Sequence, residues 1–351
     1  MSDLIHILCP GNISPLQQVV HHHSLQNLKS HWITCVENLQ PLENQKIVFS
    51  ISLDETGISV KLWEFLHEIA RGGPQYFKGC SAVIFVFGAN ELFTKSISQQ
   101  LIYYLNQAGV SFIGRPLLEA TGSMQNLKHM ALSKNLDLYE TCLIISQELM
   151  TRLMNDCPPK HKNPHLLVLH ASNWDTSNTL TLWSHVKDHL GEINIKEIHI
   201  ENGAIKDCIG CPYKTCSHYG QQDRCYYGGI VVSDIYPAIL NCHGLLLLCP
   251  NYNDAISANM SAMINRLTAL FRKTAFYDKY LFSIIVSGHS GSDIIAKQLI
   301  SALSINKTFR LPHHFAIMKT ANDPGDIEKN PDLTHLAQGF AQHIVTTLKH
   351  K

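Results

Sequence analysis

After residue 164 the chain alternates short apolar runs with segments of helical spacing, and this alternation limits the fold more than any other feature. The run LLVLH at 166–170 is apolar almost throughout, as expected for a strand that is buried on both faces. Strands alternating with helices predict a parallel sheet that is covered by helices on both sides. The pattern predicts strands at 166–170, 195–200, 245–249, 281–287 and 315–318, and helices at 177–190, 257–271, 293–303 and 333–348.

The first 150 residues carry a fainter version of the same rhythm. A segment rich in proline and charge at 156–164 reads as a linker, and a length of 351 residues suits two domains. We therefore expect α/β domains at 1–155 and 165–351. Residues 80–87 resemble residues 242–249, which suggests an internal duplication. In the first domain we expect strands at 4–8, 47–51, 82–87 and 110–113, and helices at 59–70, 96–107 and 139–153.

Composition excludes several classes of protein. Lys+Arg and Asp+Glu both total 28, so no basic field favours nucleic acid. The sequence has neither a signal-peptide pattern nor an apolar run that could span a membrane. We therefore expect a cytoplasmic protein whose 11 cysteines are reduced. The histidine run at 21–23 predicts the solvated face of a helix, with a metal site as the alternative.

A loop rich in hydroxyl groups follows the strand at 166–170. It reads ASNWDTSNT over 171–179 and leads into a helix. The first N–H groups of a helix and its macrodipole attract anions, and Ser172, Ser177, Asn178 and Thr179 could add donors. The loop contains no lysine or arginine, so it is not a nucleoside triphosphate loop. A monophosphate such as that of FMN fits neutral donors, although simple helix capping would also explain these residues.

Two further polar loops follow later strands of the same domain. The sequence PNYND spans 250–254, and SGHSG spans 287–291. Ligands in open α/β sheets lie beyond the carboxyl ends of strands, which is where these loops are expected. Tyr252 offers an aromatic ring, and Gly288 and Gly291 allow the backbone to approach a flat ring closely.

With these three loops in order, residues 165–305 resemble the flavodoxin-like NADPH-dependent FMN reductase family. The carrying motifs are Ser172 to Thr179, the P-x-Y segment at Pro250 to Tyr252, and the Gly288 to Gly291 loop. The resemblance implies a doubly wound, flavodoxin-like parallel sheet that binds FMN, preceded by a degenerate flavodoxin-like domain without cofactor. The implied cofactor-binding residues are Ser172, Trp174, Ser177, Asn178, Thr179, Pro250, Asn251, Tyr252, Asn253, Asp254, Ser287, Gly288, His289 and Gly291.

The function implied by this resemblance is an FMN-dependent oxidoreductase. It would pass electrons from NAD(P)H or a protein donor to a quinone, a flavin or another small acceptor, and relatives of this type assemble as homo-oligomers. No residue stands out as catalytic, because the redox chemistry belongs to the flavin. Trp174 replaces the arginine usual in the family, and Asp254 lies where small residues flank the ring. Two alternatives therefore remain: an electron-transfer or iron–sulfur module without nicotinamide turnover, and a scaffold with a decayed flavin site.

Four cysteines occupy the loop at 206–226 with the spacing C-x2-C-x4-C-x8-C. Thiolates so spaced can converge on an iron–sulfur cluster or a zinc ion. Iron–sulfur flavoproteins that resemble this family carry a compact four-cysteine motif at the same place, though with tighter spacing. A cluster, a zinc ion and a loop of free thiols all remain open. The metal ligands predicted here are Cys208, Cys211, Cys216 and Cys225.

Overall fold

The protein folds into two compact units, of which unit 1 ends at Cys157 and unit 2 begins at Pro158. This computed structural model describes residues 4–26 and 28–350. Each unit holds one five-stranded parallel sheet. Within the described ranges, no helix combines the length and the apolar character needed to cross a membrane.

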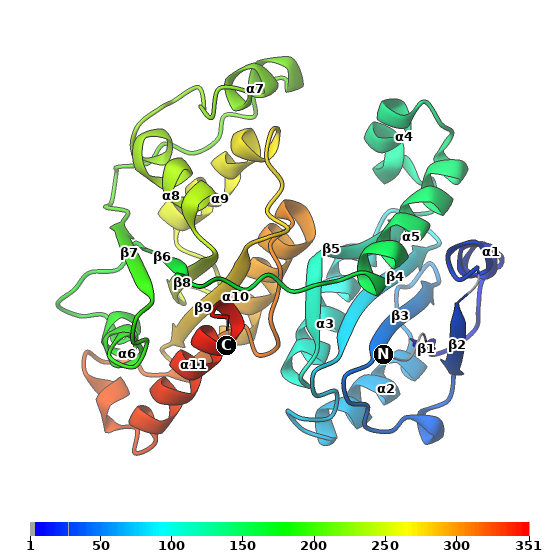
Figure 1. The fold of residues 1–351 in the computed structure, drawn as a ribbon, viewed down its shortest axis with the longest axis horizontal. Helices are drawn as coiled ribbons and strands as arrows, with labels where there is room; N and C mark the ends of the chain where they lie inside the picture. The colour runs from blue at the N-terminus through cyan, green and yellow to red at the C-terminus, as the bar shows by residue number, and fades with distance from the viewer. Residues whose placement is uncertain (1–3, 27, 351) are drawn as a thin grey trace. The chain divides into compact units, whose positions relative to one another are not determined.

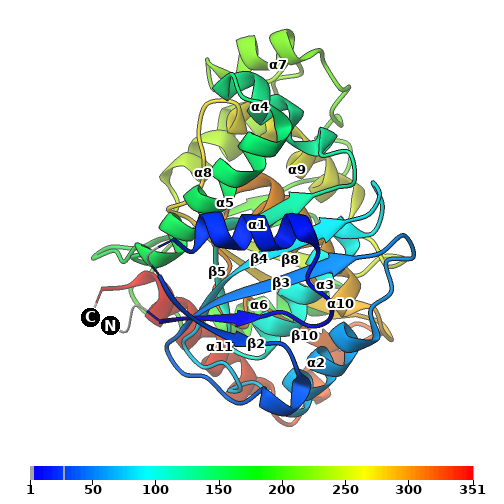
Figure 2. The same ribbon diagram turned by 90° about the vertical axis from the view of Figure 1, so that its right-hand side faces the viewer.

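Unit 1 is a three-layer α/β sandwich (Figure 1). Its sheet has the order β2-β1-β3-β4-β5, which is the flavodoxin-like order 2-1-3-4-5. Helices α1 and α5 cover one face, and α2 and α3 cover the other; Figure 2 shows α1 running roughly along the direction of the strands. The elements are β1 (Leu4–Leu8), α1 (Pro15–Ser24), β2 (Lys29–Ile33), η1 (Val36–Asn38), β3 (Lys46–Leu53), α2 (Val60–Arg71), β4 (Ser81–Gly88), α3 (Thr94–Gln107), β5 (Ser111–Ala120), η2 (Gln125–Leu127), α4 (Lys128–Lys134) and α5 (Leu138–Met154).

Unit 2 repeats this architecture with the sheet order β7-β6-β8-β9-β10, again 2-1-3-4-5. Helices α6 and α11 pack on one face, and α8, α9 and α10 lie on the other (Figure 1). The elements are β6 (His165–His170), α6 (Asn178–Lys187), β7 (Asn194–His199), α7 (Tyr213–Gly220), η3 (Val231–Ile235), α8 (Tyr236–Asn241), β8 (Gly244–Pro250), α9 (Ala258–Phe271), β9 (Tyr280–Ser287), α10 (Ser292–Leu299), η4 (Ile300–Ile305), β10 (Ala316–Thr320), η5 (Asp326–Lys329) and α11 (Leu333–Leu348).

The apolar runs of β6 and β8 follow from burial on both faces. Leu166 and Val168 of β6 join a core formed with α6 and α11, as do the even-numbered leucines of β8. Leu167 and Leu169 point to the opposite face and are equally buried. Since neither face of these strands meets water, their sequences do not alternate between apolar and polar residues. The resulting continuous apolar runs are what identified them as strands.

The predicted fold class is confirmed, but several elements had no predicted counterpart, namely α1, β2, α4, α7 and α8, and the two segments matched in the suggested duplication are not equivalent. Strand β2 is mostly exposed at the sheet edge, and α1 is rich in polar residues, so neither gave a clear pattern. The resembling segments 80–87 and 242–249 form β4 and β8, which are the fourth strand of one sheet and the third of the other. Their likeness therefore reflects two buried strands, not equivalent positions of a duplicated domain.

Candidate functional site

Three loops of unit 2 follow neighbouring strands at the carboxyl end of the sheet. β6, β8 and β9 are adjacent and parallel, so their carboxyl ends lie together. From β6 the chain runs outward to the edge strand β7 and then crosses back to β8. Such a reversal of strand order opens the crevice in which doubly wound sheets bind ligands. Loops 171–177, 251–257 and 288–291 lie at this place.

The first loop combines a helix N-terminus with a buried hydroxyl that has no partner. Ser177 is the N-cap of α6, and its side chain accepts the backbone N–H of Leu180 at 3.3 Å. The backbone N–H groups of Asn178 and Thr179 precede the first intrahelical hydrogen bond and have no helical carbonyl to bind. Ser172 is only 1% exposed, and its Oγ has no hydrogen-bond partner. An anion would satisfy these donors and the positive end of the helix.

Two predicted ligands of this loop have other roles. The Asn178 side chain donates to the carbonyl of Asp323 at 2.8 Å and accepts the N–H of Ile327 at 3.3 Å. It ties the first loop to the segment after β10, so only its backbone N–H remains for an anion. Trp174 is 57% exposed, and its ring meets His170 edge-on at 5.1 Å. The loop therefore offers neutral donors and a helix dipole, and no cationic side chain.

His170, the last residue of β6, was missed by sequence reasoning. It is 1% exposed, neither ring nitrogen has a partner, and it stacks on His199 at 4.7 Å. Burial, followed by the neighbouring His199, lowers the pKa of His170 to about 4, so the ring is neutral at physiological pH. A histidine at a strand end directly before a hydroxyl-rich loop was the available signal.

The second and third loops are locked together by the amide of Asn251. Its Nδ2 lies 3.1 Å from Asp254 Oδ1, 3.2 Å from Ser287 Oγ and 2.9 Å from the carbonyl oxygen of Ser290. Gly291 has a φ of +86°, and a Cβ there would lie 2.1 Å from Asp254 Oδ1. Glycine is therefore required at 291 both by its backbone angle and by its carboxylate neighbour.

The remaining predicted residues form the open rim of this end of the sheet. Tyr252 is 54% exposed, and Asn253, Asp254 and His289 are exposed as well. Pro250 ends β8, and the Oγ atoms of Ser287 and Ser292 are 2.7 Å apart, joining the end of β9 to the start of α10. A Cβ on Gly288 would lie 2.7 Å from Asn322 Oδ1, which places the loop after β10 at the same end of the sheet. The sequence predicted the strand at 315–318, but the loop after it was not among the predicted site residues.

The four predicted metal ligands line a single cavity of about 200 Å³ between the cysteine loop and α9. Arg266 of α9 is 3% exposed and donates to the carbonyls of Lys206 and Gly228, so it joins the two ends of the loop. The Tyr236 hydroxyl donates to the carbonyl of Arg266, and burial, then Cys225, raises the pKa of this phenol.

The thiols share this cavity without forming a ligand set. All four cysteines are free, with Cys208 exposed and the others half-buried. Across residues 4–26 and 28–350, no three His, Cys, Asp or Glu side chains are placed to hold a metal ion. As arranged here, the loop does not fit a cluster or a zinc ion, because either requires convergent ligands.

The matching helix N-terminus in unit 1 offers fewer free donors than the start of α6. At the start of α1, Ser14 accepts the N–H of Gln17, and the Gln17 side chain accepts the N–H of Ser14, which forms a capping box. Pro15 at the first helical position has no N–H to offer. Pro15 therefore removes one of the two backbone donors that α6 leaves for an anion, and only the N–H of Leu16 remains at α1.

Comparison with known proteins agrees with the architecture of unit 2. Residues 164–323 match the model of the NADPH-dependent FMN reductase family. This segment is therefore a flavodoxin-like NADPH-dependent FMN reductase domain. Members of this family bind FMN and use NAD(P)H with small acceptors. No match was found among the curated proteins searched.

Several solved structures are similar to this chain at low sequence identity. RosB with a bound 8-demethyl-8-formylriboflavin-5'-phosphate intermediate has 11% identity and a TM-score of 0.40, covering 53% of this chain and 82% of its own. An azoreductase from Bacillus anthracis strain Sterne has 12% identity and a TM-score of 0.39, covering 53% and 100%. The apo form of an NADH:FMN oxidoreductase has 14% identity and a TM-score of 0.37, covering 54% and 92%. Likeness at this level concerns the fold alone.

Proposed function

We propose that unit 2 is an FMN-dependent oxidoreductase domain that takes electrons from NAD(P)H or a protein donor and passes them to a quinone, a flavin or another small acceptor in the cytoplasm. The family that residues 164–323 match supports FMN as the proposed cofactor. The observation that carries the proposal for this chain is the buried, unpartnered Oγ of Ser172 in the loop that opens α6. A buried hydroxyl without a partner is unfavourable, and a phosphate oxygen would supply the missing acceptor.

The residues present fit an FMN phosphate held without a cation. Ser172 Oγ and the backbone N–H groups of Asn178 and Thr179 would donate to it, while Ser177 holds the helix start in place. The loops at 250–254 and 287–291, fixed to one another through Asn251, would bound the ring. Bound FMN supplies the electron-transfer chemistry, and the protein supplies binding and orientation. Among the predicted residues none is proposed as a general acid or base.

The proposal is tested by titrating the full chain with FMN and measuring the absorbance spectrum of the complex. A bound flavin peak, followed by bleaching when NADPH is added without oxygen, is the expected result. A bound flavin that NADPH and NADH both leave oxidised would favour the electron-transfer module. A chain that binds no FMN would favour the scaffold function. The exposed Trp174 and the Asp254 carboxylate in the loop at 250–254 are the observations that support this alternative.

We further propose that unit 1 is a flavodoxin-like domain without a cofactor of its own. The missing N–H of Pro15 supports this, because it leaves the start of α1 with one free backbone donor where α6 has two. The FMN titration should therefore saturate at one flavin per chain. A stoichiometry of two would contradict the proposal.

For the cysteine loop, cluster binding is a proposal that depends on movement of the loop. Its support is that Cys208, Cys211, Cys216 and Cys225 line one cavity, although they do not form a ligand set as placed. Iron and acid-labile sulfide in anaerobically prepared protein, lost in Cys208→Ala, would support a cluster. Zinc without sulfide would indicate a zinc ion, and neither element would indicate free thiols.

A further inference from the structure

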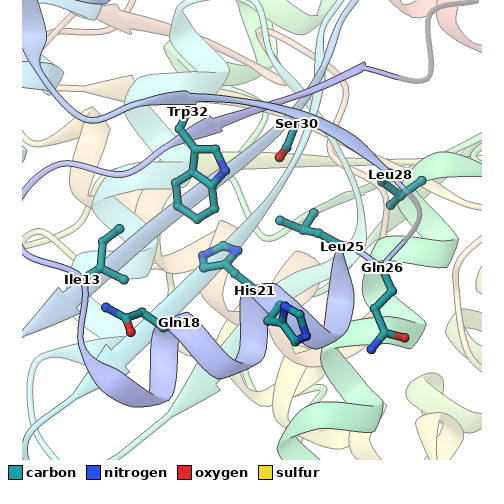
Figure 3. Close-up of a pocket in the computed structure, with 9 residues that line it drawn as sticks. Ile13, Gln18, His21, Leu25, Gln26, Leu28, Ser30 and Trp32 are labelled. Carbon is teal, nitrogen blue, oxygen red and sulfur yellow. The ribbon is translucent and has the colours of Figure 1, made fainter.

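A second cavity, of about 640 Å³, lies in unit 1 between α1 and the edge strand β2 (Figure 3). Its size is within the range of small-molecule sites. The apolar part of its lining comes from Ile13, Leu25, Leu28 and the indole of Trp32. Trp32 lies on β2 and is 36% exposed, so an aromatic surface is available at the wall of the cavity.

His21 of α1 forms the inner wall of the same cavity. Within the histidine run, whose predicted face was solvated, His21 is only 2% exposed, so that prediction was wrong for this residue. Its ring stacks on Phe85 of β4 at 5.5 Å and meets Trp32 edge-on at 4.9 Å. Figure 3 shows the ring pointing from the helix toward Trp32.

The hydrogen-bond network around His21 determines its tautomer. The backbone N–H of Ser14 donates to Gln17 Oε1, which fixes the orientation of that amide, and Gln17 Nε2 then donates to Ser50 Oγ at 2.8 Å. Ser50 is fully buried, and its one proton is left for His21 Nε2, 2.7 Å away. Nε2 is therefore the acceptor, and the ring proton resides on Nδ1. The opposite tautomer would leave the Ser50 proton without an acceptor.

This assignment makes Nδ1–H a buried donor that has no hydrogen-bond partner. Burial lowers the pKa of His21 to about 4, so the ring stays neutral and keeps a single proton on Nδ1 at physiological pH. The lining is mixed, because Gln18, His22, Gln26 and Ser30 accompany the apolar residues, and it contains no lysine or arginine. A neutral donor in such a site suits an uncharged acceptor oxygen better than an anion, which would lose its hydration without gaining a counter-ion.

We propose that this cavity binds a planar aromatic molecule carrying a carbonyl oxygen, which packs against Trp32 and accepts a hydrogen bond from His21 Nδ1. His21 Nδ1 is buried in this structure and Trp32 packs edge-on against the ring, so the proposal requires the Trp32 indole to turn as the ligand enters. Rotamer changes of exposed side chains take place within picoseconds to nanoseconds. All residues of this site belong to unit 1, so the proposal gives unit 1 a ligand of its own.

The experiment compares two probes of nearly the same shape on the full chain. 2-Acetylnaphthalene carries a carbonyl oxygen, and 2-isopropenylnaphthalene replaces it with a methylene group. Calorimetry should give about tenfold tighter binding of the acetyl probe, because only it satisfies the buried donor. The titration is repeated with saturating FMN, which should leave the affinity unchanged. Equal affinity for the two probes, no binding of either, or displacement by FMN would overturn the proposal.

Matched tryptophan variants locate the bound probe. Trp32→Leu should weaken binding of 2-acetylnaphthalene at least tenfold, because it removes the aromatic wall. Trp63→Leu, a change at a comparably exposed tryptophan on α2 that does not line the cavity, should leave the affinity unchanged. An unaffected Trp32→Leu variant that still unfolds cooperatively would also overturn the proposal, as would equal losses in both variants.

Discussion

Replacing Ser172 with alanine should separate the anion-binding role of this residue from any role in folding. In the cofactor-free protein the Ser172 Oγ is buried and has no hydrogen-bond partner, so its removal breaks no hydrogen bond. Leaving a polar group buried without a partner costs about 1–3 kcal/mol. Ser172→Ala should therefore leave the free energy of unfolding unchanged or raise it by about 1 kcal/mol, since a small void offsets part of the gain.

FMN binding should respond in the opposite direction. A hydrogen bond from a hydroxyl to a charged phosphate contributes about 1.5–3 kcal/mol, which corresponds to a loss of roughly 10- to 150-fold in affinity. A serine of a binding site can be replaced with a gain in stability and a loss of ligand affinity, whereas loss of a structural hydrogen bond would lower stability. A purely structural serine at this place would not produce this combination.

The assay is FMN fluorescence quenching for affinity, together with urea unfolding of the cofactor-free protein. Ser304→Ala is the matched control, because Ser304 Oγ in unit 2 is also buried without a partner but lies in η4. The control should change stability in the same way and leave FMN affinity unaltered. Unchanged FMN affinity in Ser172→Ala, or destabilisation by more than about 1 kcal/mol, would refute the reasoning.

Three further predictions concern unit 2. Ser177→Ala should lower the free energy of unfolding by about 1 kcal/mol because it removes the cap of α6, whereas Ser257→Ala, at a helix start where the side chain makes no cap, should be nearly neutral in the same urea titration. Gly291→Ala should destabilise the protein by more than Gly191→Ala; both have positive φ, but only at 291 would the new methyl lie 2.1 Å from a carboxylate oxygen. The free energy of unfolding should fall as the pH drops from 6.5 to about 4, because the pKa of His170 is lowered in the folded state. The unfolded chain takes up the proton first, and the loss of stability is complete only below the pKa of the folded state. His170→Gln should flatten this part of the pH profile, and an unaltered slope would contradict it.

The sequence by itself determined the layered α/β fold and the order of the loops in unit 2. Strands such as β6 and β8 are buried on both faces, so their apolar runs were visible without knowledge of their partners. The hydroxyl-rich loop before α6 could be predicted for a different reason, because a helix start depends on a few consecutive residues. Features that depend on consecutive residues in this way can be predicted from the sequence alone.

Only the tertiary structure decided which polar groups remain available to a ligand. Asn178 looked like a phosphate donor, but its side chain binds a carbonyl 145 residues away. His21 looked solvated until β2, which has no clear strand pattern, placed Trp32 over it. The Ser172 hydroxyl, by contrast, is left without any partner. A side chain's partners come from segments distant in sequence, and their burial is a property of the packed layers, so neither can be read from residue types and spacing.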